Sequence, residues 1–106
     1  MTLYDIFMDI AHVENGLAYG DIQFSYDNLM SAMKPGHPAD ILDDIFGEIG
    51  NKLYLDPDAS IDIDSLETVL RKMKEFKSCF KIKEIGKPMN ELQAYINARK
   101  AESEKA

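Results

Sequence analysis

The chain of 106 residues has one cysteine, Cys79, no tryptophan and only two histidines. A single cysteine cannot form an internal disulfide, which favours a reducing, cytoplasmic compartment. No apolar run approaches the ~18 residues that a membrane-spanning helix needs. The first residues also lack the basic region that begins a signal peptide. We therefore expect a cytoplasmic protein that does not engage a membrane.

Patterns typical of catalysis are missing as well. There is no Ser/His/Asp set, no His/Cys cluster at metal-ligand spacing and no glycine-rich phosphate loop. Asp43 and Asp44 are neighbours on a predicted helix, so their side chains diverge by about 100° and do not converge on one atom. His12 and His37 are predicted to lie at the surface, and Cys79 in the core. We expect no enzymatic activity and no cofactor.

Charge is plentiful but unevenly distributed. The net charge is −7, and residues 40–67 contain nine acidic side chains against one base, Lys52. Residues 71–87 reverse the balance, with seven bases against Glu75 and Glu84. The overall field of such a chain repels nucleic acids and anionic membranes, whereas it attracts a basic protein. The charge pattern therefore predicts a basic protein partner.

Apolar residues recur at helical spacing in several stretches that are joined by short loops rich in proline and glycine. This pattern predicts an all-α fold, a compact bundle of four to five helices. We expect one helical domain over residues 1–99, a charged tail over residues 100–106 that frays, and a monomer when free. The predicted core residues are Leu3, Phe7, Ile10, Leu29, Ile41, Ile45, Phe46, Ile49, Leu66, Val69, Leu70, Met73, Leu92 and Ile96.

Capping residues suggest where the first helices begin and end. Thr2, followed three residues later by an acid, predicts the start of a first helix that ends at Asn15-Gly16 or at Gly20. Ser25 is predicted to cap a short helix carrying Leu29, Met30 and Met33. Residues 34–38 hold two prolines and a glycine, which predicts a loop. A central helix is expected from Asp40.

The second half of the chain is predicted in the same way. Asp64 resembles a helix cap because Glu67 follows three residues later, and an apolar stripe continues to Phe76. Residues 78–87 are ambiguous, since they suit a short extended piece or an irregular connection. Pro88 suits the first turn of a last helix, in which Leu92, Tyr95 and Ile96 face inward.

The run from residue 56 to residue 67 resembles the calcium loop of an EF-hand. Side chains that carry oxygen fall at five ligand positions of such a loop: Asp56, Asp58, Ser60, Asp64 and Glu67. Position 6 is Ile61, where the family has glycine for a turn that a β-branched residue resists. Calcium binding is one of three interpretations of this stretch.

A second interpretation comes from Asp64-Ser65-Leu66. Over residues 39–103 the chain resembles acyl carrier proteins, which attach 4′-phosphopantetheine to the serine of such a motif at the start of a helix. The final run AYINARKA is also similar to the last helix of that family. Asp62 stands where the family usually has glycine. The resemblance implies a prosthetic arm on Ser65.

The third interpretation covers residues 1–76. The run ILDDIF, followed by LDPD and then DSLETVLRKM, resembles bacterial immunity proteins of the colicin D type. Members of that family are small, acidic helical proteins that bind and block a toxin nuclease. The resemblance implies a non-enzymatic inhibitor whose basic partner is a toxin domain.

The acidic run suggests where a partner binds. We predict that carboxylates along the central helix and the following loop form one patch, with an aromatic anchor among them. The predicted partner-binding residues are Asp43, Asp44, Glu48, Tyr54, Asp56, Asp58 and Asp62.

Overall fold

The computed structural model describes residues 2–26 and 36–105. Within these ranges the chain forms four α-helices: α1 (Leu3–Tyr19), α2 (Pro38–Leu55), α3 (Ile63–Cys79) and α4 (Gly86–Lys105). The same residues form two very short strands and a 3-10 helix: β1 (Ser25–Tyr26), β2 (Phe80–Lys81) and η2 (Lys83–Ile85). The prediction of an all-α bundle of four to five helices is confirmed.

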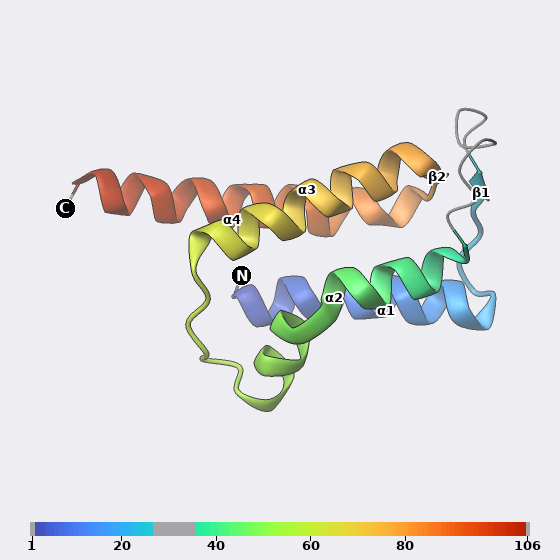
Figure 1. Ribbon diagram of the computed structural model, residues 1–106, viewed down its shortest axis with the longest axis horizontal. Coiled ribbons are helices and arrows are strands. Elements are labelled where there is room, and N and C mark those ends of the chain that lie inside the picture. Colours follow the sequence, from blue (N-terminus) through green and yellow to red (C-terminus); the bar gives the residue numbers. More distant parts are fainter. Residues whose placement is uncertain (1, 27–35, 106) are drawn as a thin grey trace.

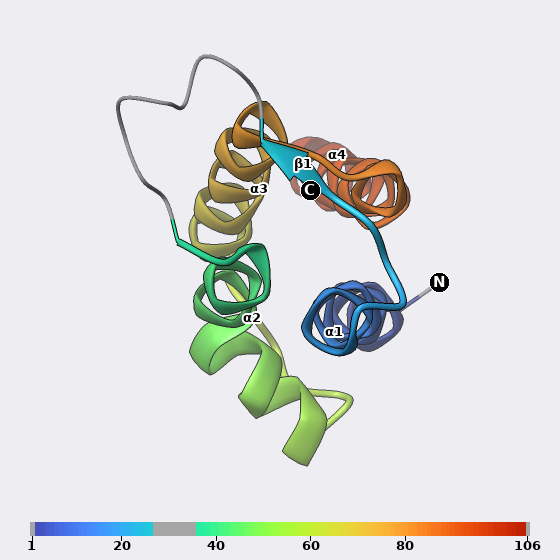
Figure 2. The same cartoon turned by 90° about the vertical axis from the view of Figure 1, so that its right-hand side faces the viewer.

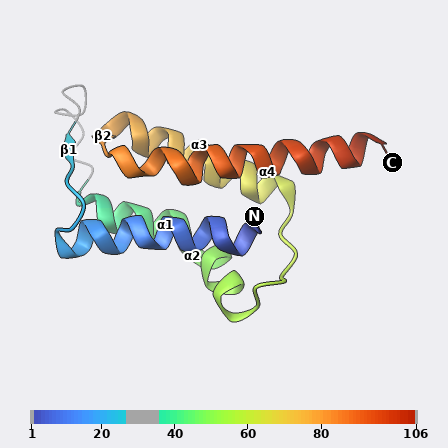
Figure 3. The same ribbon diagram turned by 180° about the vertical axis from the view of Figure 1, so that it is seen from behind.

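Successive helices run antiparallel, with α1 beside α2 and α3 beside α4 (Figure 1). Further contacts join α1 to α4 and α2 to α3. Seen along the long axis, α1 and α4 therefore lie on one side of the bundle, and α2 and α3 on the other (Figure 2). The molecule measures 46 × 27 × 20 Å, and it is long because α4 continues past the ends of the other helices (Figure 3).

Helix α1 begins where its capping residues predict. The Thr2 hydroxyl accepts a hydrogen bond from the Asp5 backbone N–H at 3.2 Å, and the Asp5 carboxylate accepts one from the Thr2 N–H at 3.1 Å. These two bonds satisfy free donors of the first turn. The helix ends at Gly20, whose φ of 81° suits glycine. Gly16 stays helical, and the side chain of Ile22 packs directly against it.

The expected helix from Ser25 is not found at its first two residues. Ser25 and Tyr26 instead form β1, which pairs antiparallel with β2 so that Ser25 lies opposite Lys81. Pairing of two backbones distant in sequence overrides the local capping preference here. The other members of that predicted helix, Leu29, Met30 and Met33, lie outside the described residues.

Helix α2 begins at Pro38, two residues before the predicted start and inside the predicted loop. Proline is well suited to the first helical position, where its missing N–H has no partner to lose. The exposed His37 side chain caps the helix, because its Nδ1 accepts a hydrogen bond from the Ala39 N–H at 3.1 Å. The prediction that the loop includes Pro38 is therefore wrong.

A kink at Gly47 divides α2 into two segments. Gly47 has φ 47° and ψ −149°, a combination that residues with a Cβ adopt only at a cost. Gly50 remains helical, and the ring of Phe46 packs where its Cβ would be. Residues 48–55 therefore leave the direction of residues 38–46 and project from the body of the bundle (Figures 1 and 2).

Replacing Gly47 with alanine is expected to lower the free energy of unfolding by about 1–3 kcal/mol, the usual cost of a strained backbone conformation. The matched control is Gly86→Ala, because Gly86 has φ −62° and open space around its Cβ position. That control is expected to leave stability unchanged or slightly raised. Urea denaturation of both variants measures the difference. Equal stabilities would show that the chain does not need the Gly47 kink.

Helix α3 is capped by Asp62 and not by the predicted Asp64. The Asp62 carboxylate accepts hydrogen bonds from the Ser65 N–H at 3.0 Å and from the Ser65 hydroxyl at 2.8 Å. Ile61 and Leu66, the residues before the cap and at the fourth helical position, are both buried and form a hydrophobic staple. Burial of this apolar pair moves the helix start two residues upstream.

Asp62→Ala is expected to lower the melting temperature by several degrees, because the N-cap is lost. The two hydrogen bonds from Ser65 hold the pKa of Asp62 below its ordinary value of 3.8. Its stabilisation is therefore present above that value and disappears as pH falls through the lowered pKa. The difference in melting temperature between wild type and Asp62→Ala should therefore disappear in strong acid.

Asp64→Ala is the matched control, since it removes the same charge from the same first turn without removing the cap. Thermal melts of the two variants from neutral to acidic pH provide the comparison. Equal losses would mean that charge near the helix terminus matters and that the cap does not.

The ambiguous stretch 78–87 proves to be irregular. Helix α3 ends at Cys79, β2 is extended, η2 is a single 3-10 turn, and α4 begins at Gly86 with Pro88 in its first turn, as predicted. The buried side chains of Phe80, Ile82 and Ile85 turn inward. The Phe80 ring centroid lies 5.0 Å from that of Phe76. This connection therefore closes one end of the core.

Most of the predicted core is buried in the structure. Ten residues are confirmed as buried: Leu3, Phe7, Ile10, Ile45, Leu66, Val69, Leu70, Met73, Leu92 and Ile96. Ile41, Phe46 and Ile49 are only partly buried; Phe46 and Ile49 flank the kink at Gly47. Leu29 is outside the described residues.

The last described residues of the chain belong to α4. Residues 100–105, predicted to fray, are helical through Lys105, and Lys100 forms an ion pair with Glu67 of α3 at 3.1 Å. Among the residues described, no helix combines the length and apolar character that crossing a membrane requires.

Candidate functional site

The predicted partner-binding residues are all exposed, but they do not share one straight helix. Asp43 and Asp44 precede the Gly47 kink, whereas Glu48 and Tyr54 follow it. The loop after α2 carries Asp56 and Asp58 and leads to the Asp62 cap. We call residues 40–67 the acidic segment. The predicted acids of the central helix do lie on α2, but Gly47 redirects the chain between Asp44 and Glu48.

Asp43 differs from the other carboxylates because it faces α1. Burial raises the pKa of Glu14, and the nearby charges of Asp43 and Asp40, with a side-chain hydrogen bond to Asp43, raise it further. Glu14 therefore binds a proton more readily than a solvated glutamate would. Asp43 belongs to this helix contact as much as to the surface.

Hydrogen bonds to backbone and side-chain atoms hold the loop that carries Asp56 and Asp58. The Asp58 N–H donates to the Asp56 carboxylate at 3.2 Å, and the Ala59 N–H donates to the Asp56 carbonyl at 3.0 Å. Farther along, the Arg99 guanidinium of α4 donates to the carbonyl of Ile61. The Asp56 N–H also donates to the Lys52 carbonyl of α2 at 2.9 Å. The loop is therefore tied to α2 at one end and to α4 at the other, so its exposed carboxylates have defined positions.

Two large apolar side chains at the end of α2 face solvent. Tyr54 is 65% exposed and Leu55 is 83% exposed, whereas Leu53 beside them is fully buried. Tyr54 is among the residues predicted from the sequence, whereas Leu55 is not. Helical geometry could have found it, because Leu55 lies about 200° around the helix from the inward-facing Leu53.

The outer carboxylates of the acidic segment, Asp44, Glu48 and Asp58, are exposed. In the described part of the chain, no Lys or Arg side chain forms an ion pair with Asp44, Glu48 or Asp58. The lysine-rich run that follows lies on α3 and the connection to α4. The negative potential around Tyr54 and Leu55 is therefore not cancelled by direct pairing.

Two residues on which the carrier and calcium interpretations depend, Ser65 and Glu67, make contacts within the fold. Ser65 is half-buried in the first turn of α3, and its hydroxyl donates to the Asp62 carboxylate. Glu67, the last of the predicted calcium ligands Asp56, Asp58, Ser60, Asp64 and Glu67, is paired with Lys100. Over residues 2–26 and 36–105, no group of three or more His, Cys, Asp or Glu side chains is arranged to hold a metal ion.

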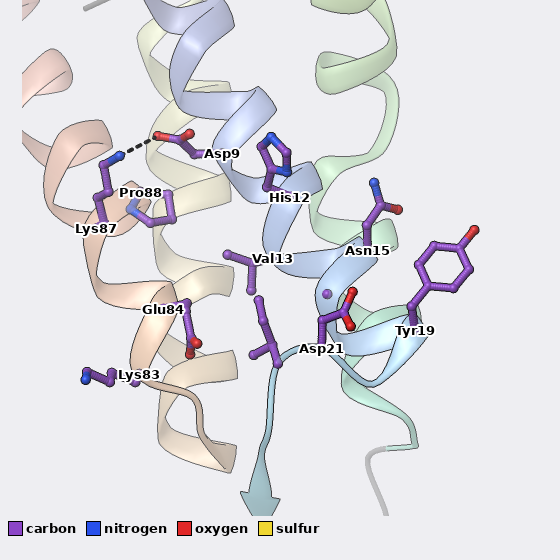
Figure 4. Close-up of a pocket in the computed structure, with 12 residues that line it drawn as sticks. Asp9, His12, Val13, Asn15, Tyr19, Asp21, Lys83, Glu84, Lys87 and Pro88 are labelled. Carbon is purple, nitrogen blue, oxygen red and sulfur yellow. Dashed lines mark ion pairs between the residues drawn. The ribbon is translucent and has the colours of Figure 1, made fainter.

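A groove of about 600 Å³ lies between α1 and the start of α4. Val13 lies at its centre, with Glu84 on one side and Asp21 on the other (Figure 4). Tyr19, which is 81% exposed, stands at its edge. No pattern in the sequence predicts this groove, because the walls of the groove come from α1, the turn after it, η2 and α4.

The upper end of this groove contains a second contact between acids. The Lys87 ammonium lies 3.7 Å from the Asp9 carboxylate. Burial raises the pKa of Glu91, and the charge of Asp9 raises it further, while the charge of Lys87 lowers it. Helix α1 therefore has a carboxylate pair on each side, with α2 through Glu14 and with α4 through Asp9.

Glu14→Gln is expected to raise the melting temperature slightly at neutral pH. The folded protein binds the Glu14 proton more tightly than the unfolded chain, so the charged carboxylate costs stability above its raised pKa. This cost is relieved as pH falls toward 4.5, the ordinary value. The gain should therefore vanish in acid, and it stays small because Glu14 is half-exposed.

Glu75→Gln is the matched control, because it removes one exposed charge from α3. Melting temperatures of both variants between neutral and acidic pH give the comparison. An equal gain from both would assign the effect to net charge and not to the contact between α1 and α2.

Comparison of the chain with protein-family models, with curated proteins and with solved structures finds no match. A function is therefore inferred from the residues of this chain and from their arrangement.

Proposed function

We propose that this chain is a non-enzymatic binding protein that holds a basic protein partner against its acidic segment. The observation that carries the proposal is the exposure of Tyr54 and Leu55 next to carboxylates that form no ion pair with a cation of the described residues. Single exposed apolar residues are common on protein surfaces. Here two of them lie side by side at the tip of a projecting helix segment, and acids surround them in the sequence.

Charge provides the attraction in this proposal. Uncompensated carboxylates such as Asp44, Glu48 and Asp58 raise the local concentration of a basic partner and speed its capture. Exposed charges give specificity and association rate more than they give affinity. A further source of binding energy is therefore needed.

Tyr54 and Leu55 supply that source. Tyrosine is enriched among the residues that dominate protein interfaces, because it buries a large ring and keeps a polar hydroxyl. At 65% exposure, Tyr54 has most of its surface available for a partner. Bonds at both ends of the adjoining loop hold the neighbouring acids in place, so binding orders fewer groups.

The partner class follows from the resemblance to colicin D-type immunity proteins. A nuclease binds the phosphates of its substrate through lysine and arginine. An acidic segment that covers those cations would compete with the substrate directly. We therefore propose a toxin nuclease or another basic protein that handles nucleic acid as the partner.

Affinity capture from a lysate of the source organism tests this proposal. The bait is wild type, and the acid-neutralised variant combines Asp44→Asn, Glu48→Gln and Asp58→Asn. The control variant removes three exposed acids elsewhere by Glu75→Gln, Glu84→Gln and Glu102→Gln. Asp43 and Asp62 are left intact, because they contact Glu14 and cap α3.

We expect wild type and the control variant to retain one basic protein that the acid-neutralised variant loses. Equimolar wild type should then inhibit the nucleic-acid-cleaving activity of that protein. Equal retention by all three baits, or a retained partner that is acidic, would contradict the proposal.

A carrier function on Ser65 is the second candidate. In its favour, Ser65 lies in the first turn of α3 with part of its side chain at the surface, which is where the resemblance to acyl carrier proteins requires the serine. Incubation with coenzyme A and a broad-specificity phosphopantetheinyl transferase, followed by intact mass measurement, separates the two candidates. We expect no added mass, whereas a prosthetic arm that is absent from Ser65→Ala would establish the carrier function.

A further inference from the structure

We propose that the groove between α1 and α4 binds a small organic cation in which an ammonium group is joined to a flat apolar body. This site is independent of the acidic segment. The groove lies on the side of the bundle formed by α1 and α4, whereas the partner-binding residues belong to α2 and the loop that follows it (Figures 2 and 4).

The shape of the groove suits a small molecule. Its volume of about 600 Å³ is within the range of roughly 300–1,000 Å³ that is typical of small-molecule sites. Val13 and Pro88, both buried, and the half-buried Ile22 line it and offer an apolar floor. Gly16 contributes to this floor, because the absence of a Cβ lets Ile22 pack directly on the helix.

The charged side chains around the apolar centre of the groove determine which ligand charge is favoured. Lys87 is held by Asp9, and the side chain of Lys83 points away from Val13 (Figure 4). Asp21 and Glu84 are exposed, and neither forms an ion pair with a described residue. Lys83 is exposed and unpaired among the described residues, but it is directed away from the apolar centre. The unpaired charges on opposite sides of this centre, Asp21 and Glu84, are negative.

The edge of the groove adds an aromatic surface. Tyr19 stands beside Asp21 at the end of α1, with 81% of its surface exposed. An ammonium group near Asp21 would lie close to an aromatic face, and aromatic faces attract cations. The body of the ligand would then cover Val13 and Ile22. An anionic ligand would instead meet two carboxylates and no free ammonium at the centre.

Three probes that share an indole body and differ in charge test this inference: tryptamine, tryptophol and indole-3-acetate. Each is titrated into the full ¹⁵N-labelled chain, and backbone amide shifts are followed by NMR. We expect saturable shifts at Val13, Gly16 and Ile22 with tryptamine. Because two exposed carboxylates add modest attraction, tryptophol should bind roughly tenfold more weakly, and indole-3-acetate more weakly still.

The variant Asp21→Asn/Glu84→Gln should reduce tryptamine affinity to that of tryptophol and leave tryptophol binding unchanged. Both side chains are exposed, so the amide spectrum should otherwise match wild type. Asp44→Asn/Glu48→Gln removes two charges from the other side and should change neither affinity. Equal binding of the three probes, shifts outside the groove, or no shifts at millimolar tryptamine would overturn the proposal.

Discussion

The acid-neutralised variant is expected to associate with the basic partner between tenfold and a thousandfold more slowly than wild type at low salt. Steering by clustered charge accelerates association by factors of this size. The dissociation rate should change less, because exposed charges act mainly on the encounter. The three acids it replaces have no ion pair among the described residues, so their loss should not destabilise the fold.

Association kinetics by surface plasmon resonance, repeated across a salt series, measure this effect. Exposed charges are screened beyond about 8 Å at physiological ionic strength. The wild-type association rate should therefore fall steeply with salt, and that of the acid-neutralised variant should remain nearly flat. The control variant has the same net charge as the acid-neutralised variant, but its association rate should depend on salt as that of wild type does. Parallel salt dependence in all three proteins would place the steering charge elsewhere.

Tyr54→Ala is expected to weaken partner binding by about 2 kcal/mol or more, which is roughly thirtyfold in Kd. The reason is burial of the ring at the centre of the interface, because the free protein leaves it 65% exposed. The stability of the free chain should barely change. Most of the lost affinity should appear as faster dissociation.

Tyr19→Ala is the matched control for this prediction. Tyr19 is also an exposed tyrosine at the end of a helix, but it belongs to α1 and to the groove. Isothermal titration calorimetry with the captured partner compares the affinities of the Tyr19→Ala and Tyr54→Ala variants. If Tyr19→Ala weakens binding as much as Tyr54→Ala does, the anchor does not lie in the acidic segment.

Periodicity alone predicts the bundle well, because apolar stripes at helical spacing define the inward faces of α1, α3 and α4. It places Phe7, Met73 and Leu92 correctly in the core. The two errors at helix starts have a different origin. Pro38 and Asp62 begin their helices through capping and through burial of neighbouring apolar residues, and those contacts depend on the tertiary fold.

The kink in α2 shows what local pattern cannot decide. Gly47 and Gly50 are both weak helix formers, and nothing in the adjacent sequence separates them. The structure bends at Gly47, while the Phe46 ring covers Gly50. Beyond the kink, Leu53 is fully buried in the core. The position of Tyr54 and Leu55 depends on which glycine bends.

The candidate sites divide in a similar way. Carboxylate density and Tyr54 are visible in the sequence because residues 40–67 are contiguous. The groove is not visible in the sequence, because Val13, Asp21 and Glu84 are brought together only by the packing of α1 against the start of α4. Long-range contacts of this kind leave no local signature.

Amide hydrogen exchange of the complex with the captured partner tests the central claim most directly. We predict that the partner slows exchange at the amides from Asp44 to Asp62, with the largest protection around Tyr54 and Leu55. The amides that line the groove, including those of Val13 and Ile22, should exchange as in the free chain. Protection confined to α1 and α4, with residues 44–62 unchanged, would contradict the assignment of partner binding to the acidic segment.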